Sequence, residues 1–214
     1  MEKKTDFKAL TNRAKVQYIW DYYRWPILIA VVVAAFIISL AHHYITYKDP
    51  LLNVIMINVN DSMSADDSGF HEFLQANNYN PKNSPVSLSA NLMFPEGDTS
   101  GSYNDLQVLS VMIAAGGQDL FFGTGDIFLN YANQGALADL RTVLSEDTLA
   151  KYQDHLIYST DDGETDSYPC AVELTDNRWL KQNNYYDSCY FGVFSRSGNP
   201  DTAKQFADFL LNYK

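Results

Sequence analysis

The amino-acid sequence predicts an α/β domain, built as a three-layer sandwich around a mostly parallel sheet and preceded by one transmembrane helix. Two observations carry this prediction. Apolar, β-branched runs alternate with helix-like segments from residue 52 to the C-terminus, which is typical of a sheet covered by helices. Before them, residues 27–41 read ILIAVVVAAFIISLA and contain no charge, which is typical of a helix that lies in lipid.

Charge divides the 214 residues at the same place. The chain has 15 Lys and Arg against 26 Asp and Glu, for a net charge of −11. Six basic and three acidic residues precede residue 26, so this end carries +3. The other nine basic and 23 acidic residues follow position 45 and give −14. Such an acidic domain repels phosphate backbones, which excludes nucleic acid as a partner.

The apolar segment and its flanks together are long enough to cross a membrane. About 20 residues rising ~1.5 Å each reach about 30 Å, the thickness of a hydrocarbon core. Aromatic residues flank both ends, and the basic residues before the segment favour a cytoplasmic N-terminus. The predicted parts are a cytoplasmic basic amphipathic segment (1–25), a transmembrane helix (26–46), a linker (47–51) and an extracellular domain (52–214). The cell membrane is the predicted location and its lipid bilayer the first partner.

Two alternatives compete with this permanent anchor. Ser39-Leu40-Ala41 is a small-x-small tripeptide, as found where signal peptides are cleaved. The long segment before the apolar run, with its bulky aromatics, argues against cleavage. A buried core helix is disfavoured because the acidic domain offers no surface that would cover all its sides.

Residues 6–24 predict a short amphipathic helix that leads into the span. Its apolar residues recur at spacings of three and four, and its basic residues lie off that stripe. Such a helix would lie on the anionic inner leaflet, or would serve only to orient the span. The stripe comprises Phe7, Leu10, Ala14, Tyr18, Tyr22 and Trp25.

The first half of the outer domain alternates strands and helices. Residues 52–59 (LNVIMINV) are nearly all apolar, which suits a central strand. The helix at 103–115 is apolar almost throughout, so we expect it to pack between the sheet and another layer; Gly116-Gly117 ends it. The other predicted elements are strands at 86–92 and 119–123 and helices at 65–77 and 126–133.

Helix caps organise the last third of the chain. Ser145 precedes Glu146 and Asp147 and is predicted to cap a helix that ends near residue 154. Asn199 is predicted to cap the last helix, with Pro200 at its first position. Strands are predicted at 155–159, 169–174 and 189–195.

Two blocks of sequence resemble a known family. Residues 107–155 contain IAAG, then DLFF, then YANQGALADL, and residues 192–211 read GVFSRSGNPDTAKQFADFLL. These motifs are similar to those of the extracellular solute-binding proteins of bacterial ABC importers. The resemblance implies one periplasmic-binding-protein-like lobe, because the chain is too short for the two-lobed clamp of that family.

Familiar catalytic motifs are missing from the sequence. It contains no G-x-S-x-G, no S-x-x-K and no glycine-lysine phosphate loop. His71-Glu72 begins an H-E-x-x pattern, but Gln75 stands where the second zinc-binding histidine is required. We therefore predict no catalytic residue, no metal site and no cofactor.

Gly123, Thr124, Gly125 and Asp126 are the predicted ligand-binding residues. They lie where a predicted strand ends and a helix begins, which is where α/β folds keep their ligand crevice. Backbone amides in such a turn can hold an anion or a small polar solute. The alternative is a plain turn in which Asp126 caps the helix.

Two further groups in the outer domain have two interpretations each. Asp161, Asp162, Glu164 and Asp166 form either a weak Ca²⁺ loop or a solvated acidic turn. Cys170 and Cys189 each begin a predicted strand. They form either a disulfide, which an oxidising exterior permits, or two buried free thiols.

These observations leave three functional hypotheses. The first is a membrane-anchored extracytoplasmic binding or scaffold domain, similar to a solute-binding protein and not an enzyme. The second is a protein-interaction subunit of a transporter-like membrane complex, and the third is an extracytoplasmic hydrolase. The second hypothesis places the interface on tyrosine-rich loops, with Tyr79, Tyr103, Tyr185, Tyr186 and Tyr190.

Overall fold

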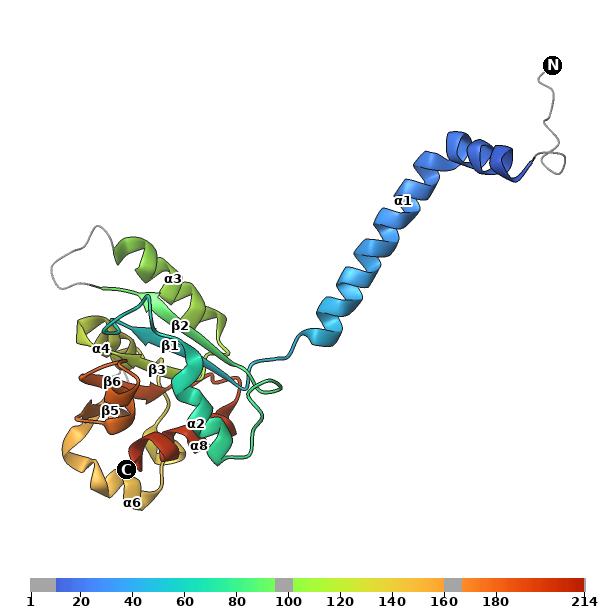
Figure 1. Cartoon of the computed structure of the whole chain (residues 1–214). Coiled ribbons are helices and arrows are strands. Elements are labelled where there is room, and N and C mark those ends of the chain that lie inside the picture. Colours follow the sequence, from blue (N-terminus) through green and yellow to red (C-terminus); the bar gives the residue numbers. More distant parts are fainter. Residues whose placement is uncertain (1–10, 95–101, 160–166, 214) are drawn as a thin grey trace. The chain divides into compact units, whose positions relative to one another are not determined.

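The structure is a computed structural model that describes residues 11–94, 102–159 and 167–213. The chain forms two compact units that divide between Tyr47 and Lys48. The first contains one long helix, α1 (Asn12–Thr46), and the second is an α/β domain with a six-stranded sheet (Figure 1).

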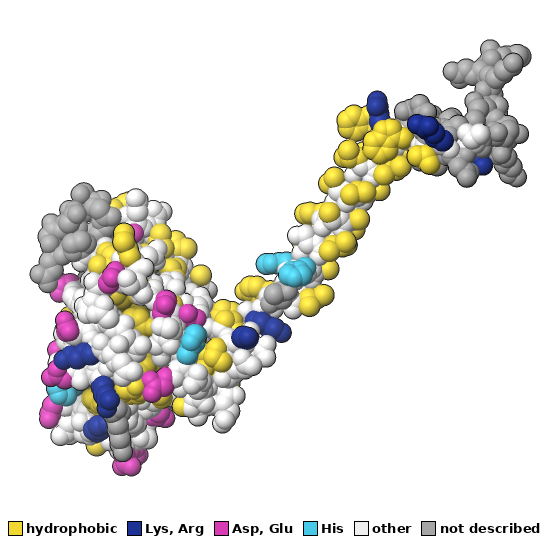
Figure 2. Space-filling model, viewed as in Figure 1, with side chains coloured by type: hydrophobic (Ala, Val, Ile, Leu, Met, Phe, Trp, Pro, Cys, Tyr) yellow, Lys and Arg dark blue, Asp and Glu magenta, His cyan; other side chains and the backbone are white. Residues whose placement is uncertain are grey.

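Helix α1 contains the apolar segment. Its stretch Tyr23–Ile45 is long and apolar enough to cross a membrane. Figure 2 shows hydrophobic side chains over most of the visible surface of this stretch. Length and composition therefore fit a membrane span or a signal anchor.

Proline interrupts the hydrogen bonding of α1. Pro26 lies inside the helix and has no amide to donate to the preceding turn. Figure 1 shows that α1 changes direction on the N-terminal side of its long straight part. A proline inside a helix is a usual cause of such a bend. The predicted amphipathic stripe from Phe7 to Tyr22 lies outside the described side chains.

The sheet of the domain is mixed. Its strand order is β2-β1-β3-β6-β5-β4, in which β1 pairs in parallel with β2 and β3 and the other three pairs are antiparallel. The prediction of a mostly parallel sheet is therefore not confirmed. The segment between β5 and β6, residues 176–187, reverses the direction of the chain, as an antiparallel pair requires. The strands are β1 (Leu52–Ile57), β2 (Val86–Leu92), β3 (Leu120–Gly123), β4 (Leu156–Tyr158), β5 (Pro169–Thr175) and β6 (Ser188–Val193).

The predicted helices of the domain are present, and two short ones were not predicted. The unpredicted helices are α5 (Leu140–Val143) and α7 (Arg178–Gln182). The predicted helix at 65–77 is divided into a 3₁₀ turn (Asp67–Gly69) and α2. The helices that were predicted are α2 (Phe70–Ala76), α3 (Ser102–Ala115), α4 (Gly125–Asn133), α6 (Glu146–Lys151) and α8 (Pro200–Leu211). A 3₁₀ turn at Gln153–His155 follows α6.

Different helices cover the two faces of the sheet (Figure 1). Alternate residues of β1 point to opposite faces, so that Val54 belongs to one core cluster and Ile55 to the other. The first face packs against α2, α7 and α8, with Phe70, Trp179 and Phe206 at its centre. The second face packs against α3 and α4.

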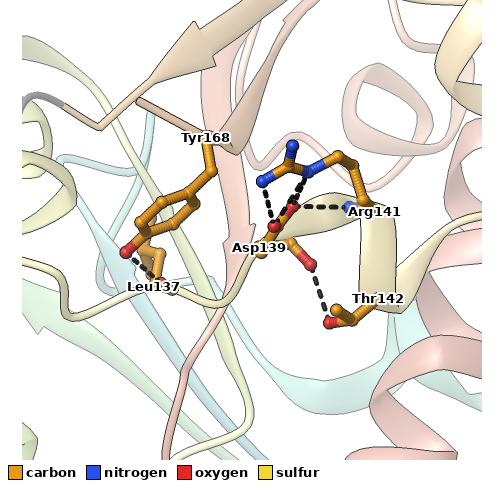
Figure 3. Close-up of polar contacts among 5 residues, drawn as sticks. All are labelled: Leu137, Asp139, Arg141, Thr142 and Tyr168. Carbon is orange, nitrogen blue, oxygen red and sulfur yellow. Dashed lines mark hydrogen bonds and ion pairs between the residues drawn. The ribbon is translucent and has the colours of Figure 1, made fainter. Parts of the chain in front are cut away.

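Side chains cap the first turns of several of these helices by local hydrogen bonds. The backbone N–H of Thr148 donates to Ser145 Oγ (3.2 Å), which confirms the predicted cap of α6. Asp139 caps α5 by accepting hydrogen bonds from the backbone N–H (2.9 Å) and the guanidinium of Arg141 (Figure 3). Partial burial opposes ionisation of Asp139, but these hydrogen bonds and the charge of Arg141 hold the pKa of its carboxyl below its ordinary value.

A fully buried carboxylate joins the start of β1, the start of β3 and the start of α8. Asp119 accepts hydrogen bonds from the backbone N–H groups of Asn53 (2.8 Å) and Asn199 (2.7 Å). It also accepts from Ser197 Oγ (2.5 Å) and Asn199 Nδ2 (3.1 Å). Asn199 therefore stands at the predicted cap position of α8, but its side chain binds Asp119 instead of the helix.

Candidate binding surface

The four predicted ligand-binding residues lie together where β3 ends and α4 begins. Gly123 is buried, and a Cβ atom there would lie 2.3 Å from Ile57 Cγ1. Gly125 has φ +76°, a conformation that glycine adopts at little cost. Both glycines therefore have structural reasons to be present. Thr124 is the N-cap residue of α4, so the interpretation of Asp126 as its cap is wrong.

The side chain of Asn58, which was not predicted as a site residue, links the ends of β1, β2 and β3 by hydrogen bonds. Asn58 follows β1 with φ +57°. Its Nδ2 donates to the carbonyl of Thr124 (3.4 Å), and its Oδ1 accepts from the backbone N–H of Phe94 (2.6 Å). Protein groups thus satisfy both ends of this amide, and a ligand-binding role for the turn stays a prediction. An Asn directly after an apolar strand is the signal that could have pointed to this position.

We expect Gly123→Ala to lower the free energy of unfolding by about 2 kcal/mol, since the new methyl group would overlap Ile57 in a packed core. The measurement is denaturant unfolding of the full chain in mild detergent. Ile57→Ala makes room for the methyl group, so the double variant should lose less than the two single losses together. Strict additivity of the two losses would contradict this packing role.

A hollow of about 410 Å³ lies near the other end of β3, before its first residue and beside the ends of α3 and α4. The hydroxyls of Ser110 and Tyr131 are 2.7 Å apart on its wall. Arg196 Nη2 donates to the carbonyls of Ile113 (3.2 Å) and Ala114 (2.8 Å), the last turn of α3. Three distant segments build this hollow, which is why no local motif predicted it.

The described residues of the domain cover one side of α3 and leave another side exposed. Leu109 is buried against the second face of the sheet, and Met112 and Ile113 are partly buried beside it. The opposite side is exposed, with Tyr103 at 68%, Val111 at 62% and Leu106 at 36% of their full exposure. The second layer expected over this helix is not found among the residues that the structure describes.

The exposed side of α3 forms a shallow groove, which we call the α3 stripe. Its members recur at helical spacing, and none of them is charged. In Figure 2, hydrophobic side chains show on the part of the domain that α3 occupies in Figure 1. The α3 stripe consists of Tyr103, Leu106, Gln107, Ser110, Val111 and Ala114.

The predicted tyrosine interface is wrong for two of its five residues. Tyr185 and Tyr186 are both only 2% exposed. Their hydroxyls donate to the carbonyls of Asp66 (2.5 Å) and Ile57 (2.8 Å), which lets the rings be buried without an unpaired hydroxyl. Tyr79 and Tyr190 are partly buried, and Tyr103 is the exposed member.

The two cysteines are free, so the disulfide interpretation is wrong and the free-thiol interpretation holds. Cys189 on β6 pairs with Leu174 on β5. Leu174 lies four residues beyond Cys170 along β5. Four strand residues span about 13 Å, beyond the ~7 Å that a disulfide can bridge. The two side chains also belong to core clusters on opposite faces.

Both thiols are expected to resist alkylation while the domain is folded. Burial raises the pKa of Cys170 to about 11 and raises the pKa of Cys189 as well, so few thiolates form at neutral pH. An iodoacetamide-type reagent should label neither cysteine in the folded chain and both in denaturant without reductant. Labelling that requires a reductant would show a disulfide.

No metal site is found in the part of the chain that the structure describes, because no three His, Cys, Asp or Glu side chains gather there. The acidic residues Asp161, Asp162, Glu164 and Asp166, predicted as a calcium loop or a solvated turn, lie outside the described residues.

Comparisons of the chain with protein-family models, with curated proteins and with solved structures found no match. The resemblance to solute-binding proteins therefore stays a prediction.

Proposed function

We propose that this chain is a membrane-anchored, non-catalytic binding module that presents its α/β domain outside the cell and docks a protein at the α3 stripe. The observation that carries the proposal is the exposure of Tyr103, Leu106 and Val111 on one helix. A helix that is apolar on all sides is normally covered on all sides, yet the described residues of the domain contact α3 along one side only. A contiguous apolar patch is typical of an interaction site.

The N-terminal residues support the proposed anchor and its proposed orientation. Tyr23–Ile45 has the length and composition of a span, and the +3 charge before residue 26 favours a cytoplasmic N-terminus. The acidic domain then lies on the far side of the membrane. The missing nucleophile and metal motifs favour binding over hydrolysis.

The test is photo-crosslinking of the full chain in its native membrane. A photoreactive amino acid replacing Val111 should form an adduct with a protein, whereas the same replacement of the exposed Gln153 should not. Adding Leu106→Arg should remove the adduct, because a charge enters the contact. Adding Gln153→Arg makes the same charge change elsewhere and should leave the adduct in place. Equal labelling from both positions would overturn the proposal.

A second candidate function is the binding of a small polar solute in the hollow between α3 and α4. Its volume is in the range of small-molecule sites, and hydroxyls, amides and one guanidinium line it. An amino acid, a sugar or a short peptide that binds should raise the melting temperature of the chain by mass action. Gln134→Trp, which fills the hollow from an exposed position, should remove that rise. A flat response to all three ligand classes would exclude this function.

A further inference from the structure

We propose that the protein docked at the α3 stripe is a second copy of this chain, with the two α3 helices packed antiparallel. The inference rests on the proposed function, because it names the partner of the same surface. It follows from the order of side chains along the stripe, from the charge of the domain and from its anchor.

The α3 stripe is complementary to its own antiparallel copy. A two-fold axis midway between positions 108 and 109 brings Tyr103 of one copy opposite Ala114 of the other. The same axis brings Leu106 opposite Val111, and Gln107 opposite Ser110. A large ring thus meets a small side chain, two apolar side chains meet, and an amide meets a hydroxyl. A two-fold interface requires this kind of self-complementarity.

Small residues let such helices approach each other. Ser110 and Ala114 lie one turn apart and line the groove with Tyr103. The small side chain of Ala114 leaves one end of the groove open. In the antiparallel arrangement, the Tyr103 ring of each copy enters this open end in the other copy. This is the packing of side-chain ridges into grooves that brings helix axes within about 8–10 Å.

The negative charge of the domain favours the α3 stripe as the surface where two copies contact each other. The residues after position 45 carry −14, so two copies repel each other over most of their surfaces. The stripe itself holds no charged residue. Asp105, the one charged residue of α3, accepts a hydrogen bond from the backbone N–H of Met93 (3.1 Å) and is partly buried. Among the residues that the structure describes, two copies can therefore meet at α3 without bringing carboxylates together.

Attachment to a membrane supplies the affinity that so small a contact lacks. A 14-residue helix is about 21 Å long, and one helix pair buries less than the ~1,200 Å² of a stable interface. Anchored copies share a surface, which raises their effective concentration. We expect pairing in the membrane and dissociation in dilute detergent.

The test is disulfide cross-linking in native membranes between two differently tagged full chains, Y103C and A114C. Both positions are exposed, so the substitutions should leave the fold unchanged. Antiparallel packing puts position 103 beside position 114, while two copies of position 103 lie about 16 Å apart along the helices. A mild oxidant should therefore give the mixed disulfide at least about tenfold above either like-with-like product, since a disulfide bridges only ~7 Å between Cα atoms.

Two matched variants control the result. The unsubstituted chain should give no cross-linked product, because its own cysteines are buried. Adding Val111→Arg to both tagged chains should reduce the mixed product about tenfold, since a desolvated charge would face Leu106. Adding Gln153→Arg to both should leave the product unchanged.

Each result decides between the two proposals. A dominant like-with-like product would show parallel packing and overturn the inference. A photo-adduct at Val111 with a different protein, and no mixed disulfide, would overturn the second copy as partner while the docking function stands. The absence of both the adduct and the disulfide would overturn both.

Discussion

Phe206→Ala is expected to lower the free energy of unfolding by about 4 kcal/mol, the cost typical of removing a buried ring. Phe206 is fully buried and lies at the centre of the aromatic cluster on the first face of the sheet. Its ring centroid lies 5.1 Å from those of Phe70 and Phe73 and 5.4 Å from that of Trp179. The packed rings around it cannot close the resulting cavity without moving the helices that carry them.

Denaturant unfolding of the full chain in mild detergent, followed by near-ultraviolet circular dichroism, measures this loss. Phe209→Ala is the matched control, because Phe209 lies on the same helix and is only partly buried. We expect the control to cost clearly less, about 1–2 kcal/mol. Equal losses for the two variants would place the centre of the cluster elsewhere.

Asp119→Ala is expected to cost about 3 kcal/mol by a different mechanism. Removal of the carboxylate leaves the backbone N–H groups of Asn53 and Asn199 without their partner in a buried place. Unpaired buried donors cost more than the average hydrogen bond contributes. The same unfolding measurement checks this loss.

Asp126→Ala is the control for the buried carboxylate. Asp126 is exposed, and its replacement should change the free energy of unfolding by less than about 0.5 kcal/mol. Asp119→Asn keeps one acceptor oxygen and should fall between the two alanine variants. An Asp119→Ala chain as stable as the control would contradict the role of Asp119 as the link between β1, β3 and α8.

Local signals predicted most of the elements. The strand at 86–92 has the predicted bounds, and α8 begins at Pro200 as predicted. The cap of α6 was predicted correctly, including Ser145 as the residue that accepts the hydrogen bond. This was possible because a serine directly before two acidic residues is a local signal for the start of a helix. These features depend on residues within one or two turns of each other.

Features that depend on distant residues were not predictable. The antiparallel placement of β6 beside β3 joins segments about 70 residues apart, and nothing in either strand specifies its neighbour's direction. The separation of Cys170 and Cys189 likewise follows from the register of β5 on β6. Asn199 was predicted as a helix cap, but its side chain binds a carboxylate 80 residues earlier.

The candidate binding surface was predictable in composition but not in exposure. The apolar character of residues 103–115 predicted a helix covered on two sides, whereas the described part of the domain leaves Tyr103 and Val111 exposed. Periodicity reports which residues can be buried, while the number of layers depends on the whole fold. The turn at Gly123–Asp126 was found from its sequence, and the constraint on Gly123 comes from Ile57, which lies on another strand.

The place of α8 has a consequence for the order in which the domain folds. This helix supplies Phe206 to the core, and Asn199, just before it, completes the contacts of Asp119 from 80 residues further along the chain. The domain therefore cannot close its core until α8 has been synthesised. Until then, the aromatic side chains of the first face of the sheet lack the helix that covers them. We expect the domain to complete its fold in one late step, when α8 packs on that face.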